Sequence, residues 1–587
     1  MTIHPTHRVL LQRLPERSRL LLLSLAVGVA SGFAAVLLTW CIDGIRHLLD
    51  KGVSLPLNLQ YLILPGAGML ISLLLLKFLI KDNIGHGVTK VLLAVSRGES
   101  KIRPHNMWSS VLTSAITIGF GGSVGAEAPI VYTGAAIGSN IGKRFGLSYR
   151  NITILLGCGA AGAIAGIFKA PLAGVLFTME ILLFNISLSS MLPLLISTVS
   201  ATVVSYAFRG PTAIFAGNLT PFSMGNIPFY ILMGVLLGFG SLYFTRSTLW
   251  MEDKLGKIGN GYLKWAICSV ALGVMILLFP QLYGEGYGIV SELLGGEATL
   301  AESDSPLSFL MSGGWGIPLF FLLIFLVKVP AMTATNAGGG NGGTFGPTLF
   351  CGAIAGFVVA RCFNLAGAGV PEQNFVLVGM AAMMAGVMQA PMTAIFLIAE
   401  ISGGYALLIP LILCSTVSYG TTRIFEKYSI YTKRIAQSGD LLTHDNDQAV
   451  LTLMSTRTLI RDKYPRIYIG GHLRDVVEAV QDNNAAVAAV LDKKGRFQGL
   501  IDVGNIRKYL LRTDLYDVLK VVNVMEHAPA LITEDEKMES VMQKFDTTGA
   551  WRLPVVDSDR RYLGFISRSR VLMAYRQELK EISSTDL

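Results

Sequence analysis

Long hydrophobic segments dominate the first three quarters of the chain, and charged residues gather after about residue 440. Several segments exceed the roughly 20 residues that a helix needs to cross a bilayer, whereas others are shorter and are interrupted by glycine or proline. The segments lack period-two alternation, which excludes an outer-membrane barrel. The pattern therefore predicts an all-α polytopic membrane domain with apolar segments near 20–49, 59–80, 107–119, 127–142, 151–183, 191–208, 226–249, 262–280, 317–335, 345–363, 374–388, 391–401 and 405–424.

This apolar region is built from two repeats, over about 20–208 and 226–424. With an offset of 218, residues 121–138 match the second half at seven positions, and with an offset of 220, residues 159–181 match at eight. Chance similarity between Gly/Ala-rich helices is disfavoured because proline and glutamate recur in the same order. Short, broken segments at corresponding places in two halves are typical of transporters and their binding sites. The matched pairs include Pro129/Pro347, Pro171/Pro391 and Glu180/Glu400.

The charge distribution separates the membrane part from a soluble tail. The last 147 positions hold 42 of the 87 charged residues, although the chain as a whole is 52% hydrophobic. Such an apolar composition excludes an ordinary soluble enzyme. We expect a membrane domain over 20–438 and two similar α/β units over 450–512 and 517–577. Each unit pairs two strands across a charged turn and continues into a helix.

Basic residues before the first apolar segment predict how the chain enters the membrane. Arg8, Arg13, Arg17 and Arg19 precede a segment from Leu20 to Trp40 that is long enough to span. By the positive-inside rule, residues 1–19 are expected to be cytoplasmic, and so is the tail. The segment lacks a convincing cleavage site, so it is interpreted as a retained helix. The net charge of +9 comes without a basic stripe interleaved with aromatic residues, which argues against nucleic acid as a partner.

Glu127 is the most informative single residue, because an ionisable group at membrane depth is costly and marks a candidate functional site. It lies in the glycine-rich segment 121–129 (GGSVGAEAP). The equivalent segment of the second repeat is 339–347 (GGNGGTFGP), in which Phe345 takes the place of the glutamate. The start of a helix has unpaired N–H groups and a partial positive charge, so it binds anions. Dipoles hold an anion less tightly than a fixed lysine would and so permit its release.

A carboxylate beside such a helix start competes with an external anion for the same position. Two interpretations of Glu127 follow: a protonatable gate, or a helix cap without a transport role. We favour the gate, since the residue lies in the most strongly repeated feature of the sequence.

These residues resemble the CLC family of chloride channels and proton-coupled chloride transporters over nearly the whole chain. GAEAP at 125–129 is similar to the family's Gly-Lys/Arg-Glu-Gly-Pro motif, which identifies Glu127 as the gating glutamate. GGTFGP at 342–347 resembles the Gly-x-Phe-x-Pro motif, and this implies that the amides of Thr344 and Phe345 face the anion. The segment 429–432 (SIYT) resembles the one that supplies an anion-coordinating tyrosine, here Tyr431. The resemblance implies two inverted repeats per subunit, a homodimer with one anion path in each subunit, and a paired CBS module as the tail.

Two departures from the family pattern affect the anion path. Gly-Ser-Gly-Ile-Pro is replaced by GHGVT at 85–89, so His86 stands where a serine hydroxyl would meet the anion beside Gly87. Either His86 donates an N–H and titrates near neutral pH, or it turns aside and backbone amides act alone. Proton-coupled members carry an inner glutamate directly after Glu180, where this chain has Ile181, which cannot relay a proton. The repeat of Glu180 as Glu400 favours a shared structural role for this pair.

A third departure concerns the tail. The family's nucleotide-binding pattern in CBS modules is incomplete at 502–505 (DVGN) and 567–570 (SRSR). An adenine nucleotide is therefore left unsupported as a ligand, and no cofactor is expected. A platform for dimerisation or gating is the preferred interpretation of the tail.

From the sequence we expect a voltage- or pH-gated chloride channel that conducts anions passively across the plasma (inner) membrane and is gated by Glu127. The first alternative is a chloride/proton antiporter with a non-standard proton path. The second, from a different class, is a non-conducting membrane sensor with a CBS output domain. An intramembrane enzyme is not expected, because zinc and nucleophile motifs are missing from the apolar segments. The expected partners are chloride or another small monovalent anion, the lipid bilayer and a second copy of the chain.

Overall fold

The computed structural model of the chain describes residues 15–52, 56–82, 84–85, 87–96, 100–182, 188–215, 217–296, 305–311, 313–437, 454–483 and 485–583. Residues 1–14 of the expected cytoplasmic segment and 450–453 of the expected first tail unit lie outside these ranges. The chain divides into two compact units, Met1–Leu441 and Leu442–Leu587, which we call the membrane unit and the tail unit. The boundary agrees with the change in charge density near residue 440.

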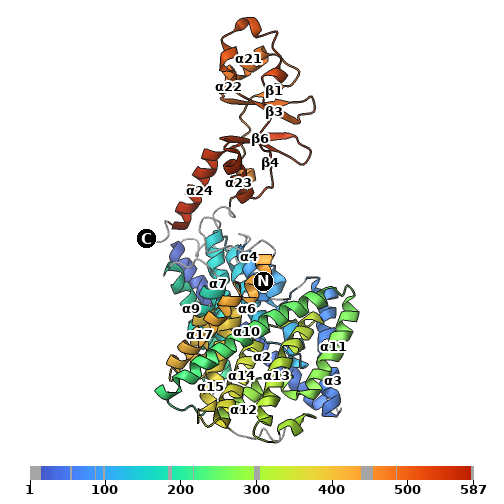
Figure 1. Cartoon of the computed structure of the whole chain (residues 1–587), viewed down its shortest axis with the longest axis vertical. Helices are drawn as coiled ribbons and strands as arrows, with labels where there is room; N and C mark the ends of the chain where they lie inside the picture. Colours follow the sequence, from blue (N-terminus) through green and yellow to red (C-terminus); the bar gives the residue numbers. More distant parts are fainter. Residues whose placement is uncertain are drawn as a thin grey trace, which may run out of the picture. The chain divides into compact units, whose positions relative to one another are not determined.

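The membrane unit is helical throughout its described residues, apart from its connecting loops (Figure 1). Its α-helices are α2 (Glu16–Gly52), α3 (Leu57–Leu74), α4 (Gly87–Ser96), α5 (Ser109–Gly119), α6 (Glu127–Arg144), α7 (Tyr149–Phe168), α8 (Pro171–Phe177), α9 (Leu188–Arg209), α10 (Ile227–Gly256), α11 (Gly261–Leu278), α12 (Tyr287–Gly295), α13 (Gly316–Ala337), α14 (Phe345–Leu365), α15 (Glu372–Met388), α16 (Pro391–Ile401), α17 (Leu408–Phe425) and α18 (Ile430–Gln437).

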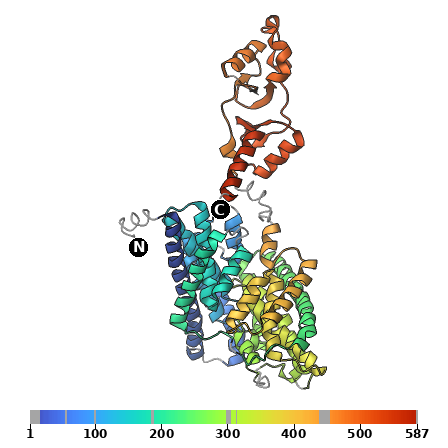
Figure 2. The same ribbon diagram turned by 90° about the vertical axis from the view of Figure 1, so that its left-hand side faces the viewer.

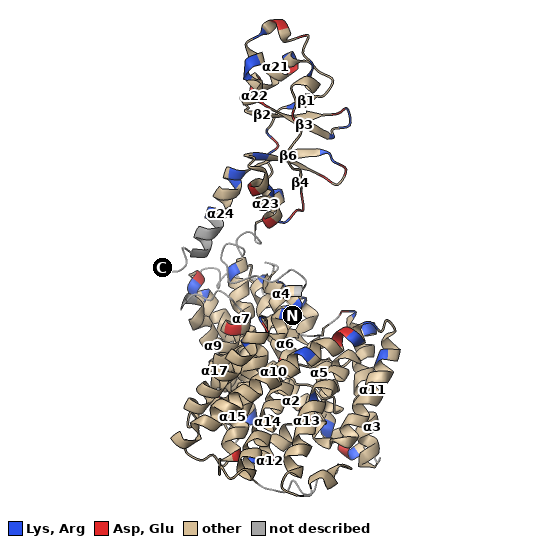
Figure 3. Ribbon diagram, viewed as in Figure 1, with Lys and Arg blue, Asp and Glu red and all other residues tan. Residues whose placement is uncertain are grey.

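Length and composition allow many of these helices to cross a membrane. Among the described residues, nine helices are long and apolar enough to span, and five shorter apolar helices accompany them. Charged residues are sparse along the membrane unit compared with the tail unit (Figure 3). Short apolar helices beside full-length ones are also a feature of transporters with broken helices. The protein is a multi-pass membrane protein, in agreement with the sequence-based prediction.

The two sequence repeats form equivalent helix pairs that lie side by side, the first half blue to teal and the second green to orange (Figure 2). In the first repeat, α6 packs on α7 so closely that a Cβ on Gly134 would lie 2.1 Å from the carbonyl oxygen of Gly159. In the second repeat, α14 packs on α15, and a Cβ on Gly352 would lie 2.5 Å from the carbonyl oxygen of Gly379. The repeated glycines are therefore the contact points of the same helix pair built twice.

The predicted apolar segment 151–183 is one continuous run in the sequence but two helices in the structure. Lys169 ends α7 in the left-handed conformation, with φ of 56°, and Pro171 begins α8. The equivalent break in the second repeat has Gln389 at φ of 53° before Pro391 begins α16. A proline suits the first turn of a helix because its missing N–H has no partner to lose there. The paired prolines thus mark matching helix starts.

These two helix starts are capped reciprocally between the repeats. The Glu180 carboxylate accepts hydrogen bonds from the N–H groups of Met392 and Thr393 at the start of α16, and from the Thr393 hydroxyl. The Glu400 carboxylate accepts from the N–H groups of Leu172 and Ala173 at the start of α8. Such an exchange is what an approximate two-fold relation between repeats produces. The expected structural role of this glutamate pair is confirmed.

The tail unit contains two three-stranded sheets. The first has the order β1 (Arg466–Tyr468), β2 (Val487–Leu491), β3 (Phe497–Asp502), and is accompanied by α21 (Leu473–Asn483) and α22 (Val503–Leu510). The second has the order β4 (Ile532–Thr533), β5 (Arg552–Val556), β6 (Tyr562–Ser567), with α23 (Met538–Thr548) and α24 (Arg568–Ser583). In each sheet the predicted hairpin is antiparallel. The sequence analysis missed the short third strand, which pairs in parallel with the hairpin.

The predicted boundaries of the two tail units need correction, because the halves exchange segments. Met454 and Leu459, assigned to 450–512, pack in the core of the second half beside Ile532. Conversely, Val521 and Val524, assigned to 517–577, pack in the core of the first half. Linear division of the sequence failed because each core is completed by residues from outside its own hairpin and helices.

We expect Glu400→Ala to destabilise the membrane unit, because it leaves two N–H groups at the start of α8 without their acceptor. Leu172 is exposed, whereas Ala173 is buried, and an unsatisfied buried donor costs about 1–3 kcal/mol. Thermal unfolding of the purified protein in detergent measures the loss. Glu292→Ala, at an exposed position of α12, is the control and should unfold at the wild-type temperature. Equal unfolding temperatures for both variants would contradict the capping role.

Candidate anion site

The starts of α6 and α14 are joined directly by their preceding loops. The Gly125 N–H donates to the carbonyl oxygen of Gly343 at 3.1 Å, and the Gly343 N–H donates to the carbonyl oxygen of Gly125 at 2.7 Å. These two residues occupy the same position in the two repeats, at the offset of 218. The bridge brings two helix N-termini, each with a partial positive charge, to one place inside the protein.

Glu127 is the first residue of α6, and its side chain reaches across to α14. It is 2% exposed. One carboxylate oxygen, Oε2, accepts a hydrogen bond from the Gly346 N–H at 3.1 Å, and the other, Oε1, accepts from the Tyr287 hydroxyl at 2.6 Å. The carboxylate thus occupies a helix N-terminus, which is a position that suits an anion.

Two glycines leave the space that this carboxylate fills. A Cβ on Gly125 would lie 2.1 Å from Glu127 Oε2, and a Cβ on Gly346 would lie 2.9 Å from Oε1. The same Cβ on Gly346 would also lie 2.9 Å from the Tyr287 hydroxyl oxygen. A larger residue at either position would therefore displace the Glu127 side chain from its place beside the backbone of α14.

The other expected anion-binding residues gather around the same helix starts. The Thr344 hydroxyl donates to the Tyr431 hydroxyl at 3.3 Å, and both side chains are buried. Phe345 begins α14, and its ring packs against Phe168 and Phe177 from the first repeat, at centroid distances of 5.5 and 6.1 Å. Gly87 begins α4, where a Cβ would lie 2.6 Å from the carbonyl oxygen of Ala128. Glu127, Thr344, Phe345, Tyr431 and Gly87 thus belong to one region.

Two of the singled-out positions have a different status. His86 lies outside the described residues. Ile181 is 5% exposed and lies in the π-helical segment Thr178–Leu182 that continues α8. A buried isoleucine at this position has no group that exchanges protons. The neighbouring Glu180 is engaged in capping α16, as described above.

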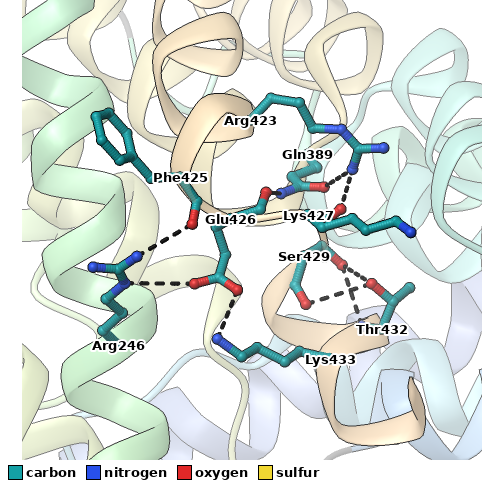
Figure 4. A network of polar contacts seen from close by, with 9 residues as sticks. All are labelled: Arg246, Gln389, Arg423, Phe425, Glu426, Lys427, Ser429, Thr432 and Lys433. Atoms are coloured by element: carbon teal, nitrogen blue, oxygen red, sulfur yellow. Dashed lines mark hydrogen bonds and ion pairs between the residues drawn. The ribbon is translucent and has the colours of Figure 1, made fainter. Parts of the chain in front are cut away.

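A network of charged and polar side chains fixes the short helix α18, which carries Tyr431 (Figure 4). The Glu426 carboxylate pairs with Lys433 of α18 at 2.7 Å and with Arg246 of α10 at 3.5 Å. The Gln389 amide donates to the carbonyl oxygen of Glu426 at 2.8 Å, and the Ser429 hydroxyl accepts from the Thr432 N–H at 3.2 Å. Tyr431 is therefore presented to Thr344 by a helix that is anchored at its start.

Comparison with known protein families identifies the membrane unit. The family described as voltage gated chloride channel matches residues 67–423, which is more than half of the chain. The chain belongs to the voltage gated chloride channel family. A second match, to the CBS domain, covers residues 521–577 of the tail unit. Members of this family are ion transporters and channels rather than enzymes, and CLC-type anion transport is the activity of the family.

Individual relatives have low sequence identity to this chain, but the match covers most of its length. A ClcB-like chloride channel protein of Ralstonia nicotianae is 26% identical over 434 residues, covering 70% of this chain and 96% of the relative. An H(+)/Cl(-) exchange transporter, ClcA, of Cronobacter sakazakii is 27% identical and covers 69% of this chain and 87% of the relative. The solved structure of a slow cyanobacterial Cl-/H+ antiporter has a TM-score of 0.60 at 22% identity, covering 72% of this chain and 98% of that one. It supports the CLC fold.

Three residues of the site were missed by the sequence analysis: Tyr287, Glu285 and Lys328. Glu285 accepts a hydrogen bond from the Ala126 N–H at 3.2 Å, directly before Glu127. Lys328 is fully buried in α13 and donates to the Ser123 hydroxyl at 2.8 Å and to the carbonyl oxygen of Gly284 at 3.4 Å. Lys328 is a lone charge within the apolar segment 317–335, so the rule that drew attention to Glu127 applied to it equally. Tyr287 and Glu285 gave no such signal, because they lie in a polar interval between apolar segments.

We expect Gly346→Ala to move the Glu127 side chain away from α14, since the new methyl group would overlap its carboxylate. The measurement is the side-chain position of Glu127 in an electron cryo-microscopy map of the variant. Gly288→Ala, in α12 with open space around its Cβ position, is the matched control and should leave Glu127 in place. Retention of the Gly346–Glu127 hydrogen bond in Gly346→Ala would show that the predicted overlap is wrong.

Proposed function

We propose that this chain exchanges chloride for protons across the membrane, with Glu127 as the group that both blocks the anion path and carries the proton. The observation that carries the proposal is the position of its carboxylate at the N-terminus of α14, held by the Gly346 N–H and the Tyr287 hydroxyl. The names of relatives matched over about two thirds of the chain, H(+)/Cl(-) exchange transporters, support exchange.

The Tyr287 hydroxyl and the Gly346 N–H, which donate to the Glu127 carboxylate, are both neutral. Hydrogen bonds between a charged acceptor and neutral donors hold the group in place but release it more readily than a cation would. An arriving chloride ion can replace the carboxylate at the helix N-terminus, where the dipole favours either anion. A proton that binds Glu127 removes the charge that ties it to this position. One side chain therefore links the movement of the anion to that of the proton.

A passive chloride channel, the preferred interpretation at the sequence level, is the second candidate. It is favoured by one observation, the isoleucine at position 181, which removes a carboxylate from the inner side of the path. The relatives' names favour exchange over this candidate. A non-conducting sensor has no observation in its favour beyond the presence of the tail unit.

We also propose the setting of this activity. Two copies of the chain assemble, each with its own path, in the plasma (inner) membrane, and the N-terminal segment and the tail face the cytoplasm. The arginines before α2 support this orientation. The transported anion is chloride or another small monovalent anion, and the tail acts without a bound cofactor.

We expect a chloride gradient to drive protons uphill into or out of liposomes that contain the purified protein. Glu127→Gln removes the proton acceptor, so it should abolish proton movement while chloride flux continues. Chloride-selective and pH electrodes record both fluxes, and parallel runs with nitrate and fluoride give the anion preference. Glu292→Gln, at an exposed position of α12, is the control and should behave as wild type.

Each alternative predicts a different record. Chloride flux without proton movement in the wild-type protein would refute exchange in favour of a passive channel. An absence of anion flux at every pH and voltage would instead favour the sensor. Unchanged proton coupling in Glu127→Gln would refute the role of Glu127.

A further inference from the structure

Two residues, one at the start of α12 and one just before it, contact the start of α6 from more than 150 residues away in the sequence. The Tyr287 hydroxyl donates to Glu127 Oε1 at 2.6 Å, which is shorter than the 3.1 Å contact from the Gly346 N–H. The Glu285 carboxylate accepts from the Ala126 N–H at 3.2 Å. The first contact involves the proposed gate itself, and the second fixes the backbone from which the gate projects.

The position of Tyr287 is set by the protein around it. It is the first residue of α12 and follows Gly286, which has a φ of 84° and therefore turns the chain in a conformation that favours glycine. Its ring packs edge-on against Phe215, with a centroid distance of 5.3 Å and an interplanar angle of 76°. Phe215 is itself buried, and its N–H donates to the carbonyl oxygen of Ile401 at 3.0 Å. The hydroxyl is thus placed by a rigid aromatic contact.

The charged groups nearby have other partners. Lys328 donates to Ser123 and to backbone carbonyl oxygens, and Glu285 accepts from Ala126. Both interact electrostatically with this site, Glu285 by repelling the Glu127 carboxylate and Lys328 by attracting it. The Tyr287 hydroxyl, in contrast, bonds directly to the carboxylate. This side-chain hydrogen bond favours the position of Glu127 in which its carboxylate lies at the start of α14.

We propose that Tyr287 is the positioning residue of the gate: its hydroxyl latches the Glu127 carboxylate at the N-terminus of α14, where a transported anion would otherwise bind. The proposal rests on the role of Glu127 proposed above. The latch and the anion compete, because the carboxylate cannot leave for chloride until the Tyr287–Glu127 hydrogen bond breaks. The strength of this one bond therefore helps to set how often the path opens.

The test is Tyr287→Phe, which keeps the ring and its packing against Phe215 and removes only the hydroxyl. Loss of a hydrogen bond to a charged acceptor should weaken the blocked state and raise chloride turnover by about tenfold or more in liposomes. The same loss should lower the number of protons moved per chloride. Tyr243→Phe is the matched control: its hydroxyl donates at 2.8 Å to the carbonyl oxygen of Leu326, and its removal should leave both quantities unchanged.

Variants at Glu127 separate the latch from the proposed gate. In a Glu127→Ala background there is no carboxylate to hold, so adding Tyr287→Phe should change nothing further. A purely structural role of the hydroxyl would instead alter transport in both backgrounds and would refute the latch. If Glu127→Ala leaves transport as in wild type, the proposed gate fails; if it alters transport while Tyr287→Phe matches wild type, only the latch fails.

A second measurement tests the latch without transport. An electron cryo-microscopy map of Tyr287→Phe should show the Glu127 side chain away from its position beside Gly346. Retention of the wild-type position would overturn the proposal even if turnover changed.

Discussion

Backbone N–H groups at helix starts inside a membrane protein must find acceptors, because lipid supplies none. The membrane unit has several such starts within its interior, and the identity of each acceptor decides what that start can do. At α8 and α16 the acceptors are carboxylates from the opposite repeat, Glu400 and Glu180, so these starts are closed. At α14 the acceptor is Glu127, the first residue of α6, whose side chain crosses to the start of α14. The second repeat has no glutamate at the equivalent position. This difference turns one of the helix starts into a candidate anion site.

The two repeats differ from each other at the candidate anion site. Glu180 and Glu400 occur in both halves, and each satisfies the other's half. Glu127 has Phe345 as its counterpart, whose ring packs into an aromatic cluster with Phe168 and Phe177. The first repeat therefore contributes the carboxylate, and the second contributes the helix N-terminus and a buried aromatic side chain. The two hydrogen bonds between Gly125 and Gly343 join the equivalent loops before α6 and α14, and so hold the two helix starts together.

The repeat explains why so much of the structure was predictable from the sequence. Glycines and prolines at matching positions gave the helix starts, and an unpaired acid among them gave Glu127. The prediction failed where contacts depend on segments outside the repeats. Tyr287 and Glu285 meet the start of α6 only because the loop after α11 folds back on it, and no periodicity reveals that contact. In the tail unit, each half borrows residues such as Leu459 or Val521 from the other, so boundaries drawn along the sequence were wrong.

Position 181 shows how a structural role constrains the route of a proton. Ile181 has no exchangeable proton, and the carboxylate beside it, Glu180, accepts three hydrogen bonds at the start of α16. All three hydrogen bonds come from the opposite repeat, so this carboxylate is engaged as a helix cap. Glu180 therefore has a structural role between the repeats and does not take the place of the missing inner acid. The proton path of the proposed exchange would therefore reach Glu127 without passing through Ile181 or Glu180.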